Sequence, residues 1–241
     1  MPDAAFANER LAALYDIAEA GRGDLVYYEA IVGELGATSV LDIGCGTGTL
    51  ACSLAASGLR VVGLDPAGAS LALARTKRSA DRVTWIEGTI EHVRDHEVDV
   101  AVMTGNVAQV FVHDAAWLEV LRGSHRCLRP GGTLVFEVRN PAFQGWTEWT
   151  KEQSLRRLAL PGGDEVITWV NVTDMSLPLV SFRHTYEFAD TTMTSDSTLR
   201  FRERKEIEDQ LAAAGFEVLE VRDAPDRPGR EFVFMCKRAR R

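Results

Sequence analysis

A short apolar run that ends directly in a cluster of glycines constrains this chain more than any other feature. The run is Ser39-Val40-Leu41-Asp42-Ile43, and Gly44, Gly46 and Gly48 follow it before a helix-forming segment from Leu50 to Ser57. A strand of nearly all apolar residues suits a parallel sheet covered on both faces. Glycine is needed where the backbone turns sharply or approaches a ligand, and the N–H groups of a helix start favour a polar or negatively charged group. The pattern predicts a strand, a ligand-binding loop and a helix.

The same alternation of apolar strands and helices continues through the first half of the chain. The predicted strands cover residues 60–64, 83–86, 98–103 and 133–138, and the predicted helices cover residues 67–75 and 115–128. Parallel strands need crossover connections, which helices supply in βαβ units. We therefore expect an α/β fold, a three-layer sandwich with a mostly parallel sheet in the middle.

The alternation stops between Asn140 and Arg202. Residues 165–173, 179–188 and 193–202 show the alternating pattern of strands with no helix between them, so they should pair antiparallel. We expect this insertion, about 140–202, to form a β-rich cap. The flanking elements are helices over 8–35 before the first strand, and a helix over 203–214 with strands over 216–221 and 231–236 after the cap. Residues 1–241 are expected to form a single domain.

Two cofactor classes use a glycine loop between a strand and a helix. Dinucleotide enzymes require G-x-G-x-x-G, in which the third glycine lets helix and strand pack closely. Here Thr49 occupies that third position, and the glycine comes one residue early, at Gly48. Asp65, at the end of the next strand, could accept both hydroxyls of a ribose, a feature that both classes share. A glycine-rich turn without a ligand is the remaining alternative.

Two segments carry a resemblance to a known family. Residues Val40-Leu41-Asp42-Ile43-Gly44-Cys45-Gly46-Thr47-Gly48 resemble the first motif of class I (Rossmann-like) S-adenosylmethionine-dependent methyltransferases, and Leu128-Arg129-Pro130-Gly131-Gly132-Thr133-Leu134 is similar to the turn before their fifth strand. The resemblance covers roughly residues 36–139 and, more loosely, the end of the chain. It implies a seven-stranded sheet with the last strand antiparallel. It also implies S-adenosyl-L-methionine as cofactor and S-adenosyl-L-homocysteine as product (EC 2.1.1.-).

The resemblance also implies a set of cofactor-binding residues. Asp42 would help to hold the amino group of the cofactor, and the loop around Cys45 would line its methionine and ribose part. Asp65 would bind the ribose hydroxyls, and Pro66 would pack near the adenine. The remaining members of the implied set are the loop glycines Gly44, Gly46 and Gly48, the adenine neighbours Thr89 and Ile90, the residues beside the methyl group Thr104, Gly105 and Asn106, and Tyr15 from the N-terminal helices.

The acceptor is expected at the mouth between the glycine loop, the end of the fifth strand and the cap. Methyl transfer from a sulfonium is an in-line displacement, so positioning is the main task of the protein. The candidate pocket residues come directly after the fifth strand or from the cap, and they are Arg139, Asn140, Trp146, Trp169 and Tyr186. The tryptophans could instead belong to the core of the cap.

His184 is the candidate catalytic base. It shares one face of its predicted strand with aromatic residues, and the unperturbed pKa of histidine lies near neutrality. A hydrogen-bonded histidine in a small core is the alternative. His92 and His96 have a spacing that can bind metal on a helix, but their charged neighbours favour a solvated face. We expect no metal site.

The composition narrows the classes of partner. A net charge of −8 argues against a surface built to neutralise phosphates. Four cysteines without a C-x-x-C pair fit neither a zinc site nor a disulfide framework, and the first ten residues contain no apolar stretch of the signal-peptide kind. We therefore expect a cytoplasmic protein, a monomer or homodimer, that acts on a small molecule and binds neither nucleic acid nor membrane.

Several functions remain open. The favoured one is a methyltransferase that acts on an oxygen or nitrogen of a small-molecule acceptor. A methyltransferase acting on RNA or protein is the main alternative, although the segment Thr104-Gly105-Asn106-Val107 lacks the Asn/Asp-Pro-Pro-aromatic run of adenine-directed enzymes. An NAD-dependent oxidoreductase is disfavoured by Thr49, and a non-enzymatic cofactor-binding module is the last alternative.

Overall fold

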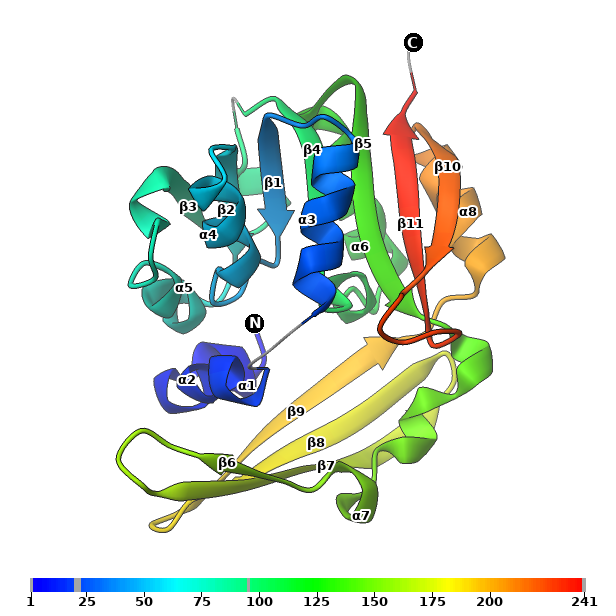
Figure 1. The fold of residues 1–241 in the computed structure, drawn as a ribbon. Helices are drawn as coiled ribbons and strands as arrows, with labels where there is room; N and C mark the ends of the chain where they lie inside the picture. The colour runs from blue at the N-terminus through cyan, green and yellow to red at the C-terminus, as the bar shows by residue number, and fades with distance from the viewer. Residues whose placement is uncertain (1, 20–22, 95, 240–241) are drawn as a thin grey trace.

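Seven strands form the main sheet of the computed structural model, which describes residues 2–19, 23–94 and 96–239. Their order across the sheet is β10-β11-β5-β4-β1-β2-β3 (Figure 1). Only β11 runs antiparallel to its two neighbours, β5 and β10. The predicted fold class is therefore confirmed. The bounds are β1 (Ser39–Ile43), β2 (Arg60–Asp65), β3 (Val83–Glu87), β4 (Val98–Met103), β5 (Leu128–Arg139), β10 (Phe216–Asp223) and β11 (Glu231–Arg238).

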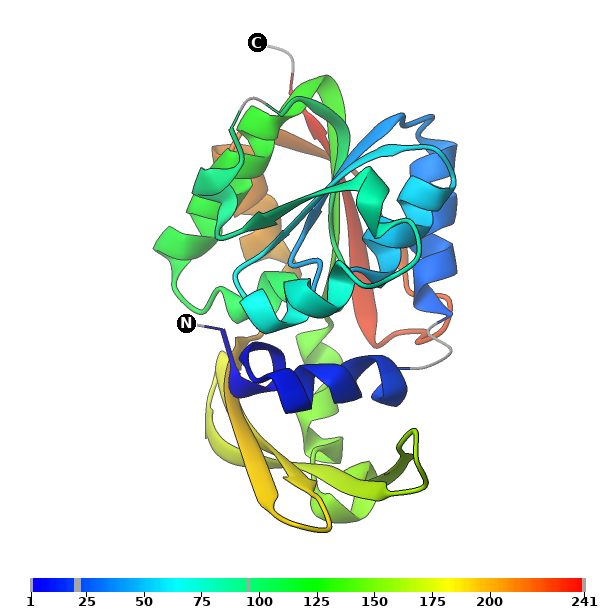
Figure 2. The same ribbon diagram turned by 90° about the vertical axis from the view of Figure 1, so that its left-hand side faces the viewer.

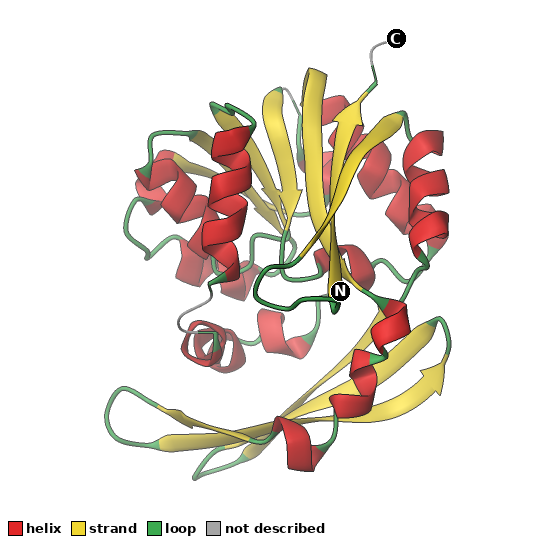
Figure 3. Ribbon diagram, turned by 45° about the vertical axis from the view of Figure 1, so that its right-hand side comes forward, coloured by secondary structure: helices red, strands yellow, loops and turns green. Residues whose placement is uncertain are grey.

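Helices cover both faces of this sheet and complete the three layers (Figure 3). On one face, α3 (Asp24–Glu34) and α4 (Thr49–Ala56) share an apolar cluster with β1, β2 and β4. On the other face, α6 (Asp114–Cys127) and α8 (Arg204–Ala213) pack on the same strands and on β5. In α6 the buried residues Trp117, Val120, Leu121 and Ser124 recur at helical spacing, which gives the helix one face toward the sheet. Shorter helices are α5 (Gly68–Ala74), η1 (Ala80–Arg82), η2 (Ile90–His92) and η3 (Val107–Val110).

The turn predicted before the fifth strand lies inside β5. The strand starts at Leu128, opposite Val98 of β4, and the next pair is Thr133 with Val100. The extra residues form a bulge, which accounts for the glycines there. A Cβ on Gly132 would lie 2.8 Å from the carbonyl oxygen of Asp99, so only glycine fits.

The predicted cap contains a second, four-stranded antiparallel sheet of order β6-β7-β8-β9. Figures 1 and 2 show this sheet below the edge of the main sheet at which the parallel strands end. One strand more is present than the sequence predicted, because β6 buries only Leu158 and so lacks an apolar pattern. The bounds are β6 (Arg156–Ala159), β7 (Glu165–Ser176), β8 (Leu179–Glu187) and β9 (Thr192–Arg200), and the connection from β5 holds η4 (Pro141–Phe143), η5 (Gly145–Glu148) and α7 (Lys151–Ser154).

Two short helices, α1 (Ala4–Ala7) and α2 (Glu9–Ala18), lie between the two sheets (Figure 2). The N–H of Ala5 donates to Ser195 Oγ of the cap at 2.9 Å, and Ser70 Oγ of α5 donates to the carbonyl of Phe6 at 2.9 Å. These helices therefore connect the cap to the main sheet. Within the helical region predicted over 8–35, residues 20–22 lie outside the described residues. None of the described helices is both long and apolar enough to cross a bilayer.

Candidate active site

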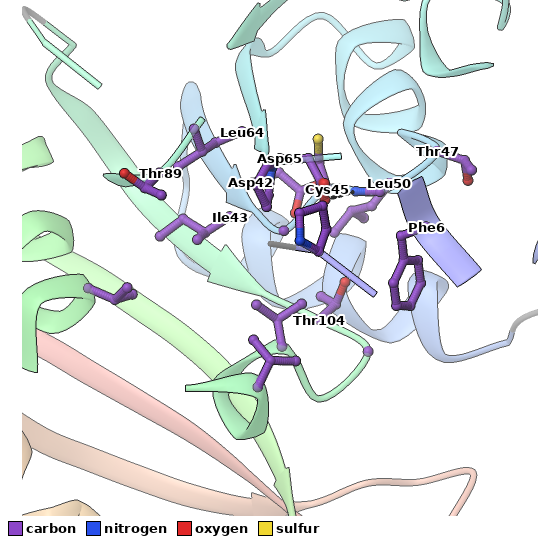
Figure 4. Close-up of a pocket in the computed structure, with 18 of the residues that line it drawn as sticks. Phe6, Asp42, Ile43, Cys45, Thr47, Leu50, Leu64, Asp65, Thr89 and Thr104 are labelled. Carbon is purple, nitrogen blue, oxygen red and sulfur yellow. Dashed lines mark hydrogen bonds between the residues drawn. The ribbon is translucent and has the colours of Figure 1, made fainter. Parts of the chain in front are cut away.

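A cavity of about 420 Å³ opens where the parallel strands β1, β2 and β4 end. Figure 4 shows Asp42 and Asp65 from the ends of β1 and β2, with Thr89 and Thr104 from the loops after β3 and β4 and Phe6 of α1 on another side. Two buried acids, Asp42 and Asp65, lie among apolar walls that include Ile43 and Leu64. A crevice of this kind at the carboxyl ends of parallel strands is the usual ligand site of open α/β sheets.

The three glycines of the loop after β1 have different tasks. A Cβ on Gly46 would meet no heavy atom within 4 Å, so the space above this residue is open for a ligand. A Cβ on Gly44 would lie 2.6 Å from Val107, and one on Gly48 would lie 2.5 Å from the ring of Trp85. Gly44 and Gly48 therefore allow close packing of the loop. Of the three, only Gly46 leaves open space beside the backbone, a cradle for a ligand that any side chain would fill.

Asp65 holds the loop in place while facing the cavity. Its Oδ2 accepts from the N–H of Gly46 and its Oδ1 from the N–H of Ala67, both at 2.8 Å. Burial raises the pKa of this carboxyl, and the two backbone N–H groups act against that shift. Each carboxylate oxygen has a second lone pair, so the group can still accept two hydroxyl hydrogen bonds. An adenosyl ligand, with a ribose diol and an apolar base, fits the acid, the cradle at Gly46 and the apolar walls.

Most of the predicted cofactor residues line this cavity. They are Tyr15, Asp42, Gly44, Cys45, Gly46, Asp65, Pro66, Thr89, Ile90, Thr104 and Gly105. Gly48 and Asn106 are not among the lining residues, since Gly48 faces Trp85 and Asn106 turns toward Glu231. Phe6 and Leu25 also line the cavity and were not predicted from the sequence. No local motif marks these two apolar residues, because only the tertiary fold brings them to the site.

One polar cluster fastens α2 over the glycine loop. Thr47 Oγ1 donates to Asp16 Oδ1 at 2.6 Å, and Lys77 Nζ lies 2.7 Å from Asp16 Oδ2. Lys77 also donates to Thr49 Oγ1 at 2.6 Å. This contact holds the N-terminal helices against the rim of the cavity.

A buried carboxylate, Glu137, organises the backbone after β4. Its Oε1 accepts from the N–H groups of Gly105 and Asn106 at 2.6 and 3.1 Å, and its Oε2 accepts from the hydroxyl of Tyr28 at 2.5 Å. The side chain is fully buried. A charged residue within the apolar run of β5 was a visible signal for this role, and the sequence analysis did not use it.

A second buried carboxylate, Glu231, stands beside Asn106. Its Oε1 accepts from Asn106 Nδ2 and from Arg227 Nη1, both at 2.9 Å. Neither Glu231 Oε2 nor Asn106 Oδ1 has a hydrogen-bond partner among the described residues. Burial, and next the charge of Glu137, raise the pKa of Glu231 to about 7. The edge of the sheet next to the cavity is therefore a dense polar network.

The predicted acceptor residues lie apart from the cavity lining. Arg139 ends β5 and donates to Gln109 Oε1 at 3.1 Å. Asn140 caps η4 through the N–H of Ala142 and donates to the carbonyl of Gly229. Trp146 is buried against Phe201, with ring centroids 4.6 Å apart.

The two other cap candidates sit on opposite faces of β7 and β8. Tyr186 pairs with Thr168, and packs with Leu11 and Leu14 of α2. Trp169, one residue further along β7, therefore points to the other face, where Lys151 Nζ lies 3.8 Å from its ring centroid. The structure does not bring Trp169 toward the cavity.

His184 is held by its neighbours on both sides of the ring. Its Nε2 lies 2.5 Å from Thr168 Oγ1 and its Nδ1 lies 3.1 Å from the hydroxyl of Tyr186. Burial, and next the charge of Arg156, lower its pKa to about 4. The geometry resembles the hydrogen-bonded histidine of a small core, and His184 is not among the residues that line the cavity.

Comparison with known proteins agrees with this site. Residues 40–132 match the family model of a methyltransferase domain. A cypemycin N-terminal methyltransferase of a Streptomyces species is 35% identical over 105 residues, which cover 43% of this chain and 43% of the relative. A ubiquinone biosynthesis O-methyltransferase of Sodalis glossinidius is 34% identical over 117 residues, 47% of this chain and 46% of the relative. The chain thus spans about half the length of the curated relatives it matches.

A solved structure covers nearly the whole chain. The amino pentose methyltransferase of calicheamicin biosynthesis from Micromonospora echinaspora, with S-adenosylmethionine bound, superposes with a TM-score of 0.71 at 22% identity, over 94% of this chain and 97% of that one. Such a likeness shows that the cap and the main sheet together follow a known fold. Residues 40–132 thus match a methyltransferase domain, and the main sheet and cap together share the fold of this S-adenosylmethionine-bound methyltransferase.

Proposed function

We propose that this protein transfers the methyl group of S-adenosylmethionine to an oxygen or nitrogen of a small molecule, and that main sheet and cap work as one domain. The observation that carries the proposal is the cavity at the ends of β1, β2 and β4, with the open cradle at Gly46 between Asp42 and Asp65. When bound there, the cofactor supplies a methyl group on a positively charged sulfur.

The residues of the chain then supply position rather than acid–base chemistry. Asp65 accepts the ribose hydroxyls, and Asp42 faces the amino group of the cofactor. Helices α1 and α2 exclude water from the cavity, with Phe6 and Tyr15 among its lining residues. Alignment of the two reactants accounts for several kcal/mol of a typical barrier reduction, so an acceptor with a free lone pair needs no base from the protein.

The lining of the cavity supports a small-molecule acceptor. The N-terminal helices lie between the main sheet and the cap (Figure 2), and all three parts contribute lining residues, among them Asp42, Phe6 and Thr198. The names of the ubiquinone and amino pentose relatives describe an O-methyltransferase and a methyltransferase for a sugar. The name of the cypemycin relative describes methylation at an N-terminus, so a peptide acceptor is the alternative to test.

Calorimetric titration with S-adenosylhomocysteine and NADH tests the cofactor. S-adenosylhomocysteine should bind, and Asp65→Ala should weaken that binding by at least about tenfold, because two buried hydrogen bonds to the ribose are lost. Asp196→Asn is the matched control, since this acid pairs with Arg183 on the surface of the cap. Binding of NADH instead of the adenosyl ligand would refute the proposal.

Labelling identifies the class of acceptor. The protein is incubated with S-adenosylmethionine carrying a tritiated methyl group and with a cell extract separated by size into small molecules and macromolecules. Label is expected in the small-molecule fraction, and the Asp65→Ala variant should give none. Label that appears only in the protein or RNA fraction would show that the acceptor is a macromolecule.

A further inference from the structure

Arg139 is a half-buried arginine at the end of β5, and no carboxylate of the described residues lies in direct contact with its guanidinium. Burial lowers its pKa, and the charges of Glu231 and Glu137 offset that shift only in part. Its one side-chain hydrogen bond among the described residues goes to Gln109, a neutral amide, at 3.1 Å. None of the ion pairs within 4.0 Å that the described residues form includes Arg139. The side chain nevertheless keeps an intermediate exposure, so part of it faces open space.

The acids that surround Arg139 are already engaged with other groups. Arg227 lies 2.9 Å from Glu231 and 3.6 Å from Glu137. Glu137 also holds Tyr28 and the backbone after β4, and Glu231 Oε1 also holds Asn106. Arg227 therefore forms ion pairs with both acids. Arg139 interacts with the charges of the same two acids only at longer range.

Arg139 is joined to one wall of the cofactor cavity through Gln109. Gln109 belongs to η3, and its neighbours Val107 and Val110 line the cavity, whereas Arg139 itself does not. On the cap side, the Arg139 Cζ lies 5.6 Å from the ring centroid of Trp149. Trp149 in turn packs edge-on against Phe182, with centroids 4.8 Å apart. A half-buried aromatic surface thus adjoins the charge.

We propose that Arg139 binds a carboxylate of the methyl acceptor, and that Trp149 and Phe182 contact the apolar part of the same molecule. This inference rests on the proposed function and adds the chemical class of its substrate, an acid with an apolar body. A guanidinium is planar and can offer two parallel N–H groups to the two oxygens of a carboxylate. Gln109 accepts from only one of the N–H groups of the Arg139 guanidinium, so other donors are left for a ligand. A bound carboxylate would also supply the missing negative charge.

The cofactor itself carries a carboxylate, so the test must separate two sources of the same chemistry. Phenylacetate serves as the acceptor-like probe, and phenylacetamide is its uncharged counterpart of nearly equal shape. Binding of both is measured by ligand-observed NMR on the protein alone and on the protein saturated with S-adenosylhomocysteine. The cofactor arm compares S-adenosylhomocysteine with 5′-methylthioadenosine, which lacks the amino-acid part.

The variants are Arg139→Gln, Arg139→Lys and the control Arg222→Gln, which removes a guanidinium that pairs with Glu34 and Glu220 on the surface. Phenylacetate should bind wild type at least about tenfold more tightly than phenylacetamide, and Arg139→Gln should remove this preference. Arg139→Lys should keep part of it, because the charge remains and the paired donors do not. Arg222→Gln should bind like wild type.

Three results would overturn the assignment. The first is equal binding of acid and amide by wild type, which needs no variant and so holds even if Arg139→Gln fails to fold. The second is unchanged phenylacetate binding in a folded Arg139→Gln variant. The third is an Arg139→Gln variant that loses affinity for S-adenosylhomocysteine but not for 5′-methylthioadenosine, which would assign Arg139 to the cofactor. A wild type that binds phenylacetate but no adenosyl ligand would refute the proposed function and leave the carboxylate site standing.

Discussion

Glu231 makes the stability of this fold depend on pH. Its folded pKa is raised from 4.5 to about 7, first by burial and next by the charge of Glu137, while Asn106, Arg227 and Arg139 act in the opposite direction. A raised carboxyl pKa means that the unfolded chain ionises first. The stability that the protonated group provides is therefore lost as pH rises from 4.5 to about 7.

Between about pH 5 and about pH 8, wild type should therefore lose stability that the Glu231→Gln variant does not lose. We expect the free energy of unfolding of wild type to fall by about 2 kcal/mol relative to that of the variant over this range. Glutamine keeps an oxygen for Asn106 and carries no charge at either pH. Urea unfolding at the two pH values measures the shift. Glu220→Gln, on the surface, should show none. A difference that is the same at both pH values would contradict the assignment of a raised pKa.

His184 makes the fold less stable as pH falls, whereas Glu231 makes it less stable as pH rises. Its folded pKa is lowered from 6.5 to about 4, so the unfolded chain binds the proton first as pH falls. Wild type should therefore lose stability between about pH 7 and about pH 4 through this residue, and His184→Gln should lose about 2 kcal/mol less over the same range. Thermal unfolding at both pH values checks this. Once the acceptor is known, the variant should also keep the pH profile of methyl transfer, and the loss of a fall in rate at low pH would restore His184 as the base.

Gly48 illustrates a glycine that packing requires. In Gly36→Ala the added methyl group would meet no heavy atom within 4 Å. The φ of +61° is then the only strain, and it should lower the free energy of unfolding by about 1 kcal/mol. Gly48→Ala, at a φ of +75°, also drives a methyl group against Trp85 and Ala74, which should add about 1–3 kcal/mol. Urea unfolding of the two variants gives the comparison. Equal costs would mean that the ring of Trp85 moves aside freely.

Helix α2 acts as one wall of the cofactor cavity, and the contacts of Asp16 fasten it. Asp16→Asn removes the ion pair to Lys77 and weakens the bond from Thr47, so the helix should lift from the loop more often. We expect S-adenosylhomocysteine to bind about threefold to tenfold more weakly by calorimetry. Asp190→Asn is the control, since its pair with Arg10 joins the same helix to the cap but is well exposed. A wild-type affinity in Asp16→Asn would show that α2 needs no such contact.

The elements that the sequence predicted best are those with a local signal. The bounds of β1 and β4 agree with the apolar runs 39–43 and 98–103, because both strands are buried on both faces. The start of α2 was not predicted correctly. The side chain of Asn8 accepts from the N–H groups of Arg10 and Leu11 and separates α1 from α2. The residues around Asn8 include few apolar ones, so they show little helical periodicity.

The parts that escaped prediction depend on residues far apart in the chain. Lys77 meets Asp16, and Tyr28 meets Glu137, only after the sheet has formed. Likewise, the face on which Trp169 lies follows from the register of β7 with β8, whereas the prediction placed it in the pocket only because it belongs to the cap. The residues that line the cavity at the strand ends were easier to predict, because they follow directly after apolar strands whose carboxyl ends meet at one edge.

Across the whole molecule, the cofactor cavity is the joint between the main sheet, the cap and the two N-terminal helices. Its walls include Asp65 at the end of β2, Thr104 after β4, Phe6 of α1 and Thr198 of β9. A ligand that contacts all of these surfaces must stabilise their arrangement relative to the unfolded chain. The effect follows mass action, and at a ligand concentration of about 100 times Kd it amounts to about 2.7 kcal/mol.

We therefore expect saturating S-adenosylhomocysteine to raise Tm by about 5–10 °C, and NADH at the same concentration to leave it unchanged. Hydrogen exchange should locate the effect, with the strongest added protection in α1, α2 and the loop after β1, because these segments close the cavity. The amide groups of β10, which lies at the edge of the main sheet and contributes no lining residue, serve as the internal control. A rise in Tm without added protection of α1 and α2 would mean that the cofactor binds to the main sheet alone, and that the N-terminal helices serve the acceptor instead.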